Sequence, residues 1–228
     1  MAKEQALKHG QLIIVIILLT VVSVTPVYAG KTAFGIKAGI NMSNAAGGPE
    51  EWDDSIEWKT GFTGGAFLNY ALNDNFSLQP ELLFTQKGFG SSLLEGIIDI
   101  DLAVSLDYFE LPILARYAFS ADKKFRPTLF AGPSFAYCFG STLAVSSWIF
   151  SGEIDFSSLT HTTDFGIVAG GGFDYVLSGG ILVIDARFTY GFTNVILSGD
   201  FEINGETETI DEDDFKNYGL SFTLGYVF

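Results

Sequence analysis

Large apolar residues alternate with small or polar residues along most of this chain. The last eleven residues show the pattern clearly, because every second position carries a large apolar side chain: Tyr218, Leu220, Phe222, Leu224, Tyr226 and Phe228. Successive side chains of a β-strand point to opposite faces. The segment therefore predicts a strand with one apolar face and one face of mostly small residues.

Seven earlier segments repeat this pattern after residue 30. Together with the last segment they predict eight strands, within residues 33–43, 60–72, 76–85, 109–119, 128–145, 164–177, 181–196 and 218–228. Single-chain bacterial outer-membrane barrels have an even number of antiparallel strands, and alternation disperses their apolar residues in the same way. The sequence thus predicts an all-β fold, an eight-stranded antiparallel up-and-down transmembrane β-barrel.

The connections between these segments are alternately long and short. The short ones lie at 73–75, 121–126 and 178–180, and the long ones are residues 45–58, 88–103, 148–163 and 197–216. Outer-membrane barrels have short periplasmic turns and long external loops. We therefore expect a barrel over residues 30–228 with four long external loops and with both termini on the periplasmic side.

The first 29 residues have the features of a cleaved signal peptide. Lys3 and Lys8 precede an apolar run over residues 12–19, and Val27-Tyr28-Ala29 resembles a cleavage site. The apolar run is shorter than the ~20 residues that a membrane-spanning helix needs. We expect residues 1–29 to be removed on export to the outer membrane; a helical membrane anchor is the alternative.

The second face of the strands distinguishes a membrane barrel from a soluble one. A soluble eight-stranded barrel would point its apolar face inward around a ligand. Here tyrosines and phenylalanines gather near the strand ends, as in the aromatic girdles of membrane barrels. The opposite face carries charges of both signs: Lys37, Glu81, Glu110, Arg116, Asp185 and Arg187. These features favour the arrangement with the apolar face outward.

We interpret these six charged residues as ion pairs inside a packed lumen, because charges removed from water are normally paired. Glu110 with Arg116, and Asp185 with Arg187, are the expected pairs. Proton handling is the alternative role, since charged residues within a membrane are functional candidates. Eight strands enclose a lumen that side chains approximately fill. We therefore expect no wide aqueous channel.

The charge of the chain excludes some partners. The formal net charge is -15, and 18 of the 26 acidic residues after residue 29 lie in the four long connections. Nucleic-acid binding needs clustered lysine and arginine, so we expect no nucleic-acid partner. The overall charge also argues against docking to an anionic lipid surface. The basic cluster Lys123-Lys124-Arg126 lies in a short turn.

The long connections contain candidates for contact with an external ligand or protein. Trp52, Trp58 and Trp148 are aromatic residues in or beside them. Tryptophan also anchors proteins at membrane interfaces, and this reading is equally supported.

The last connection has two interpretations. The spacing of Asp200, Glu202, Asn204, Glu208 and Asp211 approaches that of a calcium-binding loop. Residues 201–203 and 206–210 also flank Asn204-Gly205, the usual signal for a tight hairpin turn. We favour the hairpin, as a strand extension above the membrane, and weak calcium binding is the alternative.

Catalytic chemistry has little support in the sequence. His161 is the only histidine after residue 29, and a nucleophile such as Ser157 would have to come from the same connection. Cys138 is the only cysteine, which excludes an internal disulfide. We expect a protein that is not an enzyme and that has no cofactor.

Several segments resemble the PorT-like outer-membrane β-barrel family. They are Asp107-Tyr-Phe-Glu-Leu-Pro-Ile-Leu-Ala-Arg-Tyr117, Pro127-Thr-Leu-Phe-Ala-Gly-Pro133, Phe34-Gly-Ile-Lys-Ala-Gly-Ile-Asn41 and the Phe228 ending. The resemblance covers residues 30–228 and implies the fold and the outer membrane. Separately, the chain end with Leu224, Tyr226 and the terminal Phe228 resembles the C-terminal signal read by the barrel-assembly machinery, and Phe228 also fits as one more lipid-facing aromatic.

Two functional classes follow from this reading. The favoured one is a non-enzymatic outer-membrane protein with a structural or interaction role, whose acidic loops contact an external ligand or protein. The alternative is transport or secretion assistance, either as a narrow pore or as a subunit of a secretion complex. Secretion is the task of one branch of the family that the chain resembles, and fold alone does not choose between them.

Overall fold

The computed structural model describes residues 32–46, 56–95, 98–120, 122–147, 151–155, 160–194, 199–203, 206–210 and 216–228. Eight strands form the barrel: β1 (Thr32–Ala46), β2 (Ile56–Ala71), β3 (Phe76–Glu95), β4 (Ile98–Ala118), β5 (Phe125–Ser147), β7 (Thr163–Val176), β8 (Ile181–Asn194) and β11 (Lys216–Val227). Three short strands accompany them: β6 (Ser151–Asp155), β9 (Gly199–Ile203) and β10 (Glu206–Ile210). Within the described residues, no helix has the length and apolarity needed to cross a membrane.

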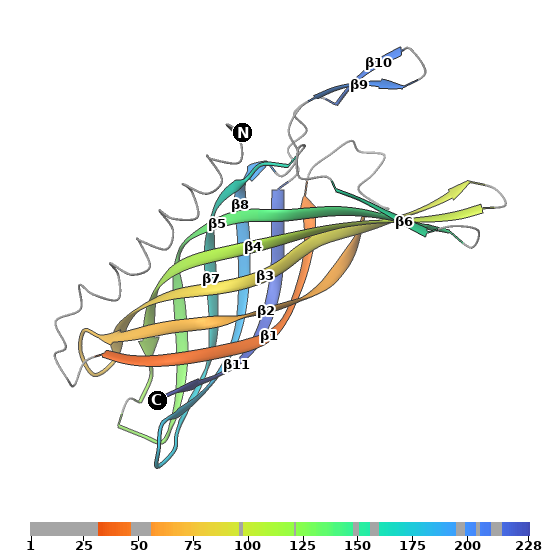
Figure 1. Cartoon of the computed structure of the whole chain (residues 1–228). Helices are drawn as coiled ribbons and strands as arrows, with labels where there is room; N and C mark the ends of the chain where they lie inside the picture. Colours follow the sequence, from red (N-terminus) through yellow and green to blue (C-terminus); the bar gives the residue numbers. More distant parts are fainter. Residues whose placement is uncertain are drawn as a thin grey trace, which may run out of the picture. The chain divides into compact units, whose positions relative to one another are not determined.

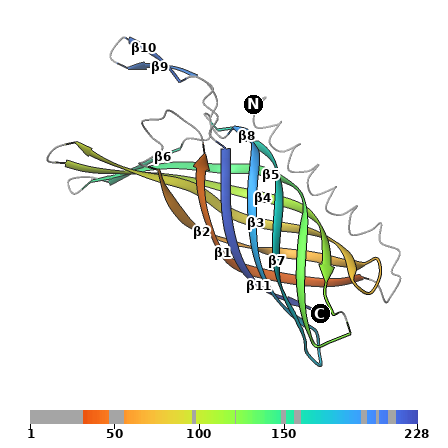
Figure 2. The ribbon, with the colours of Figure 1, turned by 180° about the vertical axis from the view of Figure 1, so that it is seen from behind.

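The eight strands close into a ring (Figures 1 and 2). Each strand pairs with its neighbour in the order β1-β2-β3-β4-β5-β7-β8-β11. The first and last strands then pair antiparallel from Gly35 opposite Val227 to Ala46 opposite Lys216, which closes the barrel. The predicted fold, an eight-stranded antiparallel up-and-down barrel, is confirmed.

The barrel is apolar outside and mostly polar inside. Along β7 the exposed and buried residues alternate, and the outward side chains of Phe165, Ile167 and Phe173 are each nearly half exposed. The same holds on the other strands, where large apolar side chains face away from the lumen. Such a continuous apolar surface would be unfavourable in water. It is the reverse of a soluble ligand-binding barrel and suits contact with lipid.

Aromatic pairs mark the two ends of this apolar surface. Near the short turns, Phe34 stacks on Phe228 with ring centroids 6.1 Å apart, and Phe125 stacks on Phe173 at 5.0 Å. At the other end, Phe109 stacks on Phe139 at 4.6 Å. Aromatic pairs therefore lie at both ends of the apolar surface, as in the aromatic girdles of membrane barrels.

Strand lengths at one end of the barrel differ from the prediction. Residues 88–103 were expected to form a long loop, but β3 and β4 continue as a paired hairpin as far as Glu95 opposite Ile98. The alternation of apolar and polar residues shows where one face of a strand contacts lipid. Pairing between two strands needs only backbone hydrogen bonds. Strand pairing can therefore continue where the pattern has ended. The same reason explains β6, which pairs with residues 142–146 of β5 inside the expected loop 148–163.

Candidate functional site in the barrel lumen

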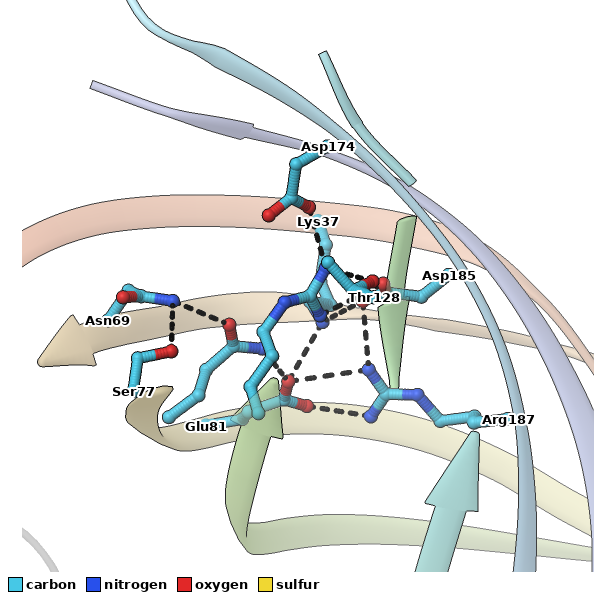
Figure 3. A network of polar contacts seen from close by, with 10 residues as sticks. Lys37, Asn69, Ser77, Glu81, Thr128, Asp174, Asp185 and Arg187 are labelled. Carbon is cyan, nitrogen blue, oxygen red and sulfur yellow. Dashed lines mark hydrogen bonds and ion pairs between the residues drawn. The ribbon is translucent and has the colours of Figure 1, made fainter. Parts of the chain in front are cut away.

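Six charged residues form one group in the lumen (Figure 3), called here the lumen cluster, and all but Asp174 are buried: Lys37, Glu81, Arg116, Asp174, Asp185 and Arg187. The Lys37 ammonium group donates to Glu81 at 2.8 Å and to Asp185 at 2.9 Å. The Arg187 guanidinium group donates two hydrogen bonds to Glu81, at 2.7 and 3.3 Å. One carboxylate thus holds two cations from different strands.

Arg116 completes the cluster on the other side. Its guanidinium group donates to Asp185 at 3.0 Å, to Asp174 at 2.6 Å and to the hydroxyl of Thr128 at 3.0 Å. The cluster therefore contains three cations and three carboxylates. Buried charges are tolerated when they are paired and hydrogen-bonded, and this balance satisfies that condition.

Glycines make room for the charged side chains. Across the strand ladders, Gly225 lies opposite Lys37, Gly172 opposite Asp185 and Gly170 opposite Arg187. A Cβ on Gly172 would lie 2.7 Å from the Asp185 carboxylate, one on Gly225 3.1 Å from the Lys37 Cβ, and one on Gly170 2.7 Å from the Phe130 ring. Each would also press on a backbone oxygen of a neighbouring strand. The glycine-rich inner faces in the sequence are therefore the complement of long charged residues on the neighbouring strands.

Apolar side chains also fill the lumen. Leu114, Phe130 and Val168 form one buried cluster, and Phe67 packs with Val183 and Val227 in another. Aromatic rings contact the cations: the Lys37 ammonium group lies 4.8 Å from the Phe67 ring centre, and both arginine guanidinium groups lie over Phe130, at 5.3 and 5.5 Å. Cation–π contacts of this kind are strongest when desolvated.

A second ion pair lies farther along the lumen, toward the extended strands. Lys87 is 2.6 Å from Glu110, which also accepts a hydrogen bond from Thr85 at 3.0 Å. The Lys87 ammonium group lies 5.0 Å from the ring centre of Tyr108, and Asn217 donates to the Tyr108 hydroxyl across the barrel. Tyr108 packs in turn with a buried apolar group: Leu106, Ala136 and Cys138.

All six lumen residues named from the sequence are buried, but one predicted pair is wrong. Glu110 does not pair with Arg116, because the two lie six residues apart on β4, about 20 Å along the strand. Glu110 pairs with Lys87, and Arg116 with Asp174 and Asp185. Asp185 and Arg187 do approach each other, at 3.6 Å, but the shorter contacts of Arg187 go to Glu81.

Two charged members of these networks were missed in the sequence. Asp174 lies within the predicted strand 164–177 but was not among the charged residues expected in the lumen, and Lys87 lies beyond the predicted end of the third strand. Lys87 could have been found from its position, because it is an even number of residues from Glu81 and therefore lies on the same face of the strand. The phenylalanines that point into the lumen, Phe67 and Phe130, could not have been found in this way, because the alternation predicts polar or small residues on that face.

The next candidates named from the sequence are the three tryptophans and the residues at the end of the chain. Trp58 is half exposed and contacts Tyr218 edge-on at 5.2 Å, whereas Trp52 and Trp148 lie outside the described residues. Phe228 and Leu224 are exposed on the apolar outer face, and the Phe228 ring packs 5.1 Å from Tyr226.

The residues proposed for calcium are only partly described. Asp200 and Glu202 lie on β9 and Glu208 on β10, while Asn204 and Asp211 lie outside the described residues. The two strands pair antiparallel from Ile203 opposite Glu206, as the hairpin interpretation predicts. Among the residues that the structure describes, no group of three or more histidine, cysteine or acidic side chains is arranged to hold a metal.

Sequence comparison identifies the family to which these features belong. Residues 26–197 match the family described as outer membrane protein beta-barrel domain. The chain belongs to this family. It is an integral outer-membrane β-barrel protein, which agrees with its apolar exterior and closed strand ladder. No protein of curated function matches the sequence.

Solved structures are also similar to this chain, and one of them is described as an outer membrane protein. Neisserial surface protein A is 15% identical, with 84% of this chain and 95% of that chain covered and a TM-score of 0.41. OprG from Pseudomonas aeruginosa is 13% identical, with 86% and 96% covered and a TM-score of 0.47. The attachment invasion locus protein Ail of Yersinia pestis is 14% identical, with 87% and 99% covered and a TM-score of 0.40.

Proposed function

We propose that this protein is a non-enzymatic outer-membrane barrel with a closed lumen, which acts through the end that carries its extended strands. The observation that carries the proposal is the lumen cluster. Its three cations and three carboxylates cross-link β1, β3, β4, β7 and β8 at the centre of the barrel. Opening a path for solutes would require separating these pairs, which is costly for buried charges.

The extended strands support an interaction role. β3, β4 and β5 continue well past the aromatic pairs Phe84–Phe109 and Phe109–Phe139, and β6 adds a further strand. β6 is the last strand of its sheet, and its Ile154 side chain is 59% exposed. An unpaired strand edge presents backbone donors and acceptors to which an extended segment of a partner can add.

The lumen cluster predicts that the protein does not conduct ions. In planar lipid bilayers, the purified protein is expected to give no stable open state. The reason is that charged and apolar side chains of the described residues occupy the lumen. Single-channel recording at neutral pH measures this, with a porin of known conductance as the positive control. A reproducible open state of the unmodified protein would support the transport alternative instead.

The interaction role predicts a partner that depends on the β6 edge. Affinity purification of the intact protein from native outer membranes is expected to retain a specific partner. Replacing Ile154 with proline removes a backbone donor from β6 and is expected to weaken that retention. Loss of the partner from the Pro variant, with the barrel still folded, is the expected result; equal retention by both proteins would remove β6 from the interface.

The same proposal includes the orientation of the barrel in the membrane and its relation to the PorT-like family. We infer that the short turns and both termini face the periplasm, because membrane barrels have their short connections there. The resemblance to the PorT-like family raises the alternative of an accessory role in an outer-membrane secretion complex. Recovery of a secretion component as the co-purified partner would favour this alternative. Labelling of an introduced Lys124→Cys residue by a membrane-impermeant maleimide on whole cells tests the orientation, and labelling of intact cells would overturn it.

A further inference from the structure

A shallow groove crosses the apolar outer face of the barrel. It has a volume of about 700 Å³ and spans five neighbouring strands, β5, β7, β8, β11 and β1. Gly171 and Ala186 lie opposite each other at its centre, where β7 pairs with β8. Larger side chains lie beside them, with Phe173 opposite Ile184 in the next outward row. The groove is therefore a gap between large apolar side chains rather than an opening into the lumen.

The groove runs obliquely across the barrel. On β5 it is lined by Pro127, two residues from the start of the strand, and by Phe119 at the preceding turn. On β1 it is lined by Ala38 and Ile40, which lie near the middle of Thr32–Ala46. Barrel strands tilt by ~35–45°, so a line of paired residues climbs at a similar angle relative to the membrane plane. The groove thus leads from a short turn toward the middle of the apolar band.

A basic turn lies at the lower end of the groove. Lys123 and Lys124 are exposed in the connection between Phe119 and Pro127, the two residues that line this end. Backbone hydrogen bonds hold the turn, from the Lys123 amide to Ser120 at 2.9 Å and from the Val176 amide to Lys124 at 2.8 Å. Neither lysine ammonium group forms an ion pair with a carboxylate of the described residues.

Local charge differs here from that of the whole chain. The net charge of -15 opposes attraction to an anionic membrane, but salt limits the reach of each exposed charge to ~10 Å. Within the turn, Asp122 is the one carboxylate beside Lys123, Lys124 and Arg126, and Arg126 donates to the Lys123 carbonyl at 2.9 Å. The turn is therefore a local positive site.

We propose that the groove and the basic turn together bind one anionic phospholipid of the membrane leaflet that meets the short turns. The Lys123 and Lys124 ammonium groups hold its phosphate, and one acyl chain lies along the groove over Gly171 and Ala186. Clusters of basic residues at one side of a membrane bind anionic lipid head groups. The proposal rests on the proposed function only in that the outer face of the barrel contacts lipid.

Native mass spectrometry of the purified protein in detergent tests the proposal. Phosphatidylglycerol and phosphatidylcholine with identical acyl chains are added separately at equal concentrations, and bound lipid is counted. The unmodified protein is expected to retain one phosphatidylglycerol molecule with roughly tenfold preference over phosphatidylcholine, since each lysine near a lipid surface contributes appreciably. Equal retention of the two lipids would overturn the proposal.

Variants separate the head-group site from the groove. K123Q/K124Q is expected to lose the preference and retain both lipids equally, whereas Ala186→Leu fills the groove and is expected to lose the bound lipid of either kind. Asp74→Asn in another short turn and Ala66→Leu, which faces outward on β2, a strand that does not line the groove, are controls that should behave like the unmodified protein.

Three results would count against this assignment. K123Q/K124Q could keep its preference, Ala186→Leu could bind lipid normally, or Ala186→Leu could change only the oligomeric state, in which case a second copy of the chain occupies the groove. Circular dichroism checks that each variant is folded. Because the measurement in detergent involves neither conductance nor orientation, its failure would leave the proposed function standing.

Discussion

Replacing Glu81 with leucine is expected to destabilise the folded barrel by about 3–5 kcal/mol, because removing one partner leaves buried charge uncompensated. The Glu81 carboxylate accepts hydrogen bonds from Lys37 and Arg187, and its side chain is fully buried. Leucine would leave three cations facing two carboxylates in the lumen cluster. Urea unfolding in phospholipid vesicles, followed by tryptophan fluorescence, measures the free energy of unfolding.

A second variant separates charge from packing. E81L/R187M removes one charge of each sign and leaves Lys37 and Arg116 with Asp174 and Asp185, so the balance is restored. Apolar replacements of a whole buried ion pair are often neutral, so the double variant is expected to recover most of the lost stability. Glu153→Leu at an exposed position on β6 is the control for loss of a carboxylate. If Glu81→Leu unfolds at the same urea concentration as the Glu153 control, the cluster does not stabilise the barrel.

Replacing Gly39 with alanine is expected to cost about 3 kcal/mol or more, at the upper end of overpacking effects. Gly39 lies on β1 opposite Thr223 of β11, at the seam that closes the barrel. A Cβ at this position would lie 2.8 Å from the carbonyl carbon of Phe222 and from the Cα of Thr223, and closer still to the Phe222 oxygen. These are backbone atoms of the paired strand, so relief requires the seam to separate.

Two glycines serve as matched controls for this substitution. A Cβ on Gly152 of β6 would meet no atom within 4 Å, and one on Gly140 of β5 would lie at an ordinary distance of 3.6 Å from Asp107. Alanine at either position is expected to change the free energy of unfolding by less than about 1 kcal/mol. The comparison uses urea unfolding in vesicles for all three proteins. Equal stability of the Gly39 and Gly152 variants would show that the seam tolerates a side chain.

The charged residues of the lumen show what the alternation of residues along the chain can and cannot predict. Parity alone puts Lys37, Glu81 and Arg187 on the inner face, because strand side chains repeat every two residues. It does not say which of them meet. Lys37 and Asp185 are 148 residues apart in sequence but lie within 2.9 Å of each other, because β1 and β8 both pair with β11 when the ring closes. Pairing by nearness in sequence therefore failed for Glu110 and Arg116.

The sequence alone determined the strand number, the outward apolar face and the inward charges, because lipid on one side and a crowded lumen on the other impose a period of two on every strand. Only the tertiary structure decided the ion-pair partners, the inward phenylalanines and the extended β3–β4 hairpin. These depend on barrel stagger and on contacts across the lumen, which join strands without regard to their separation along the chain. The groove has the same origin, since Gly171 and Ala186 become neighbours only through the register of β7 and β8.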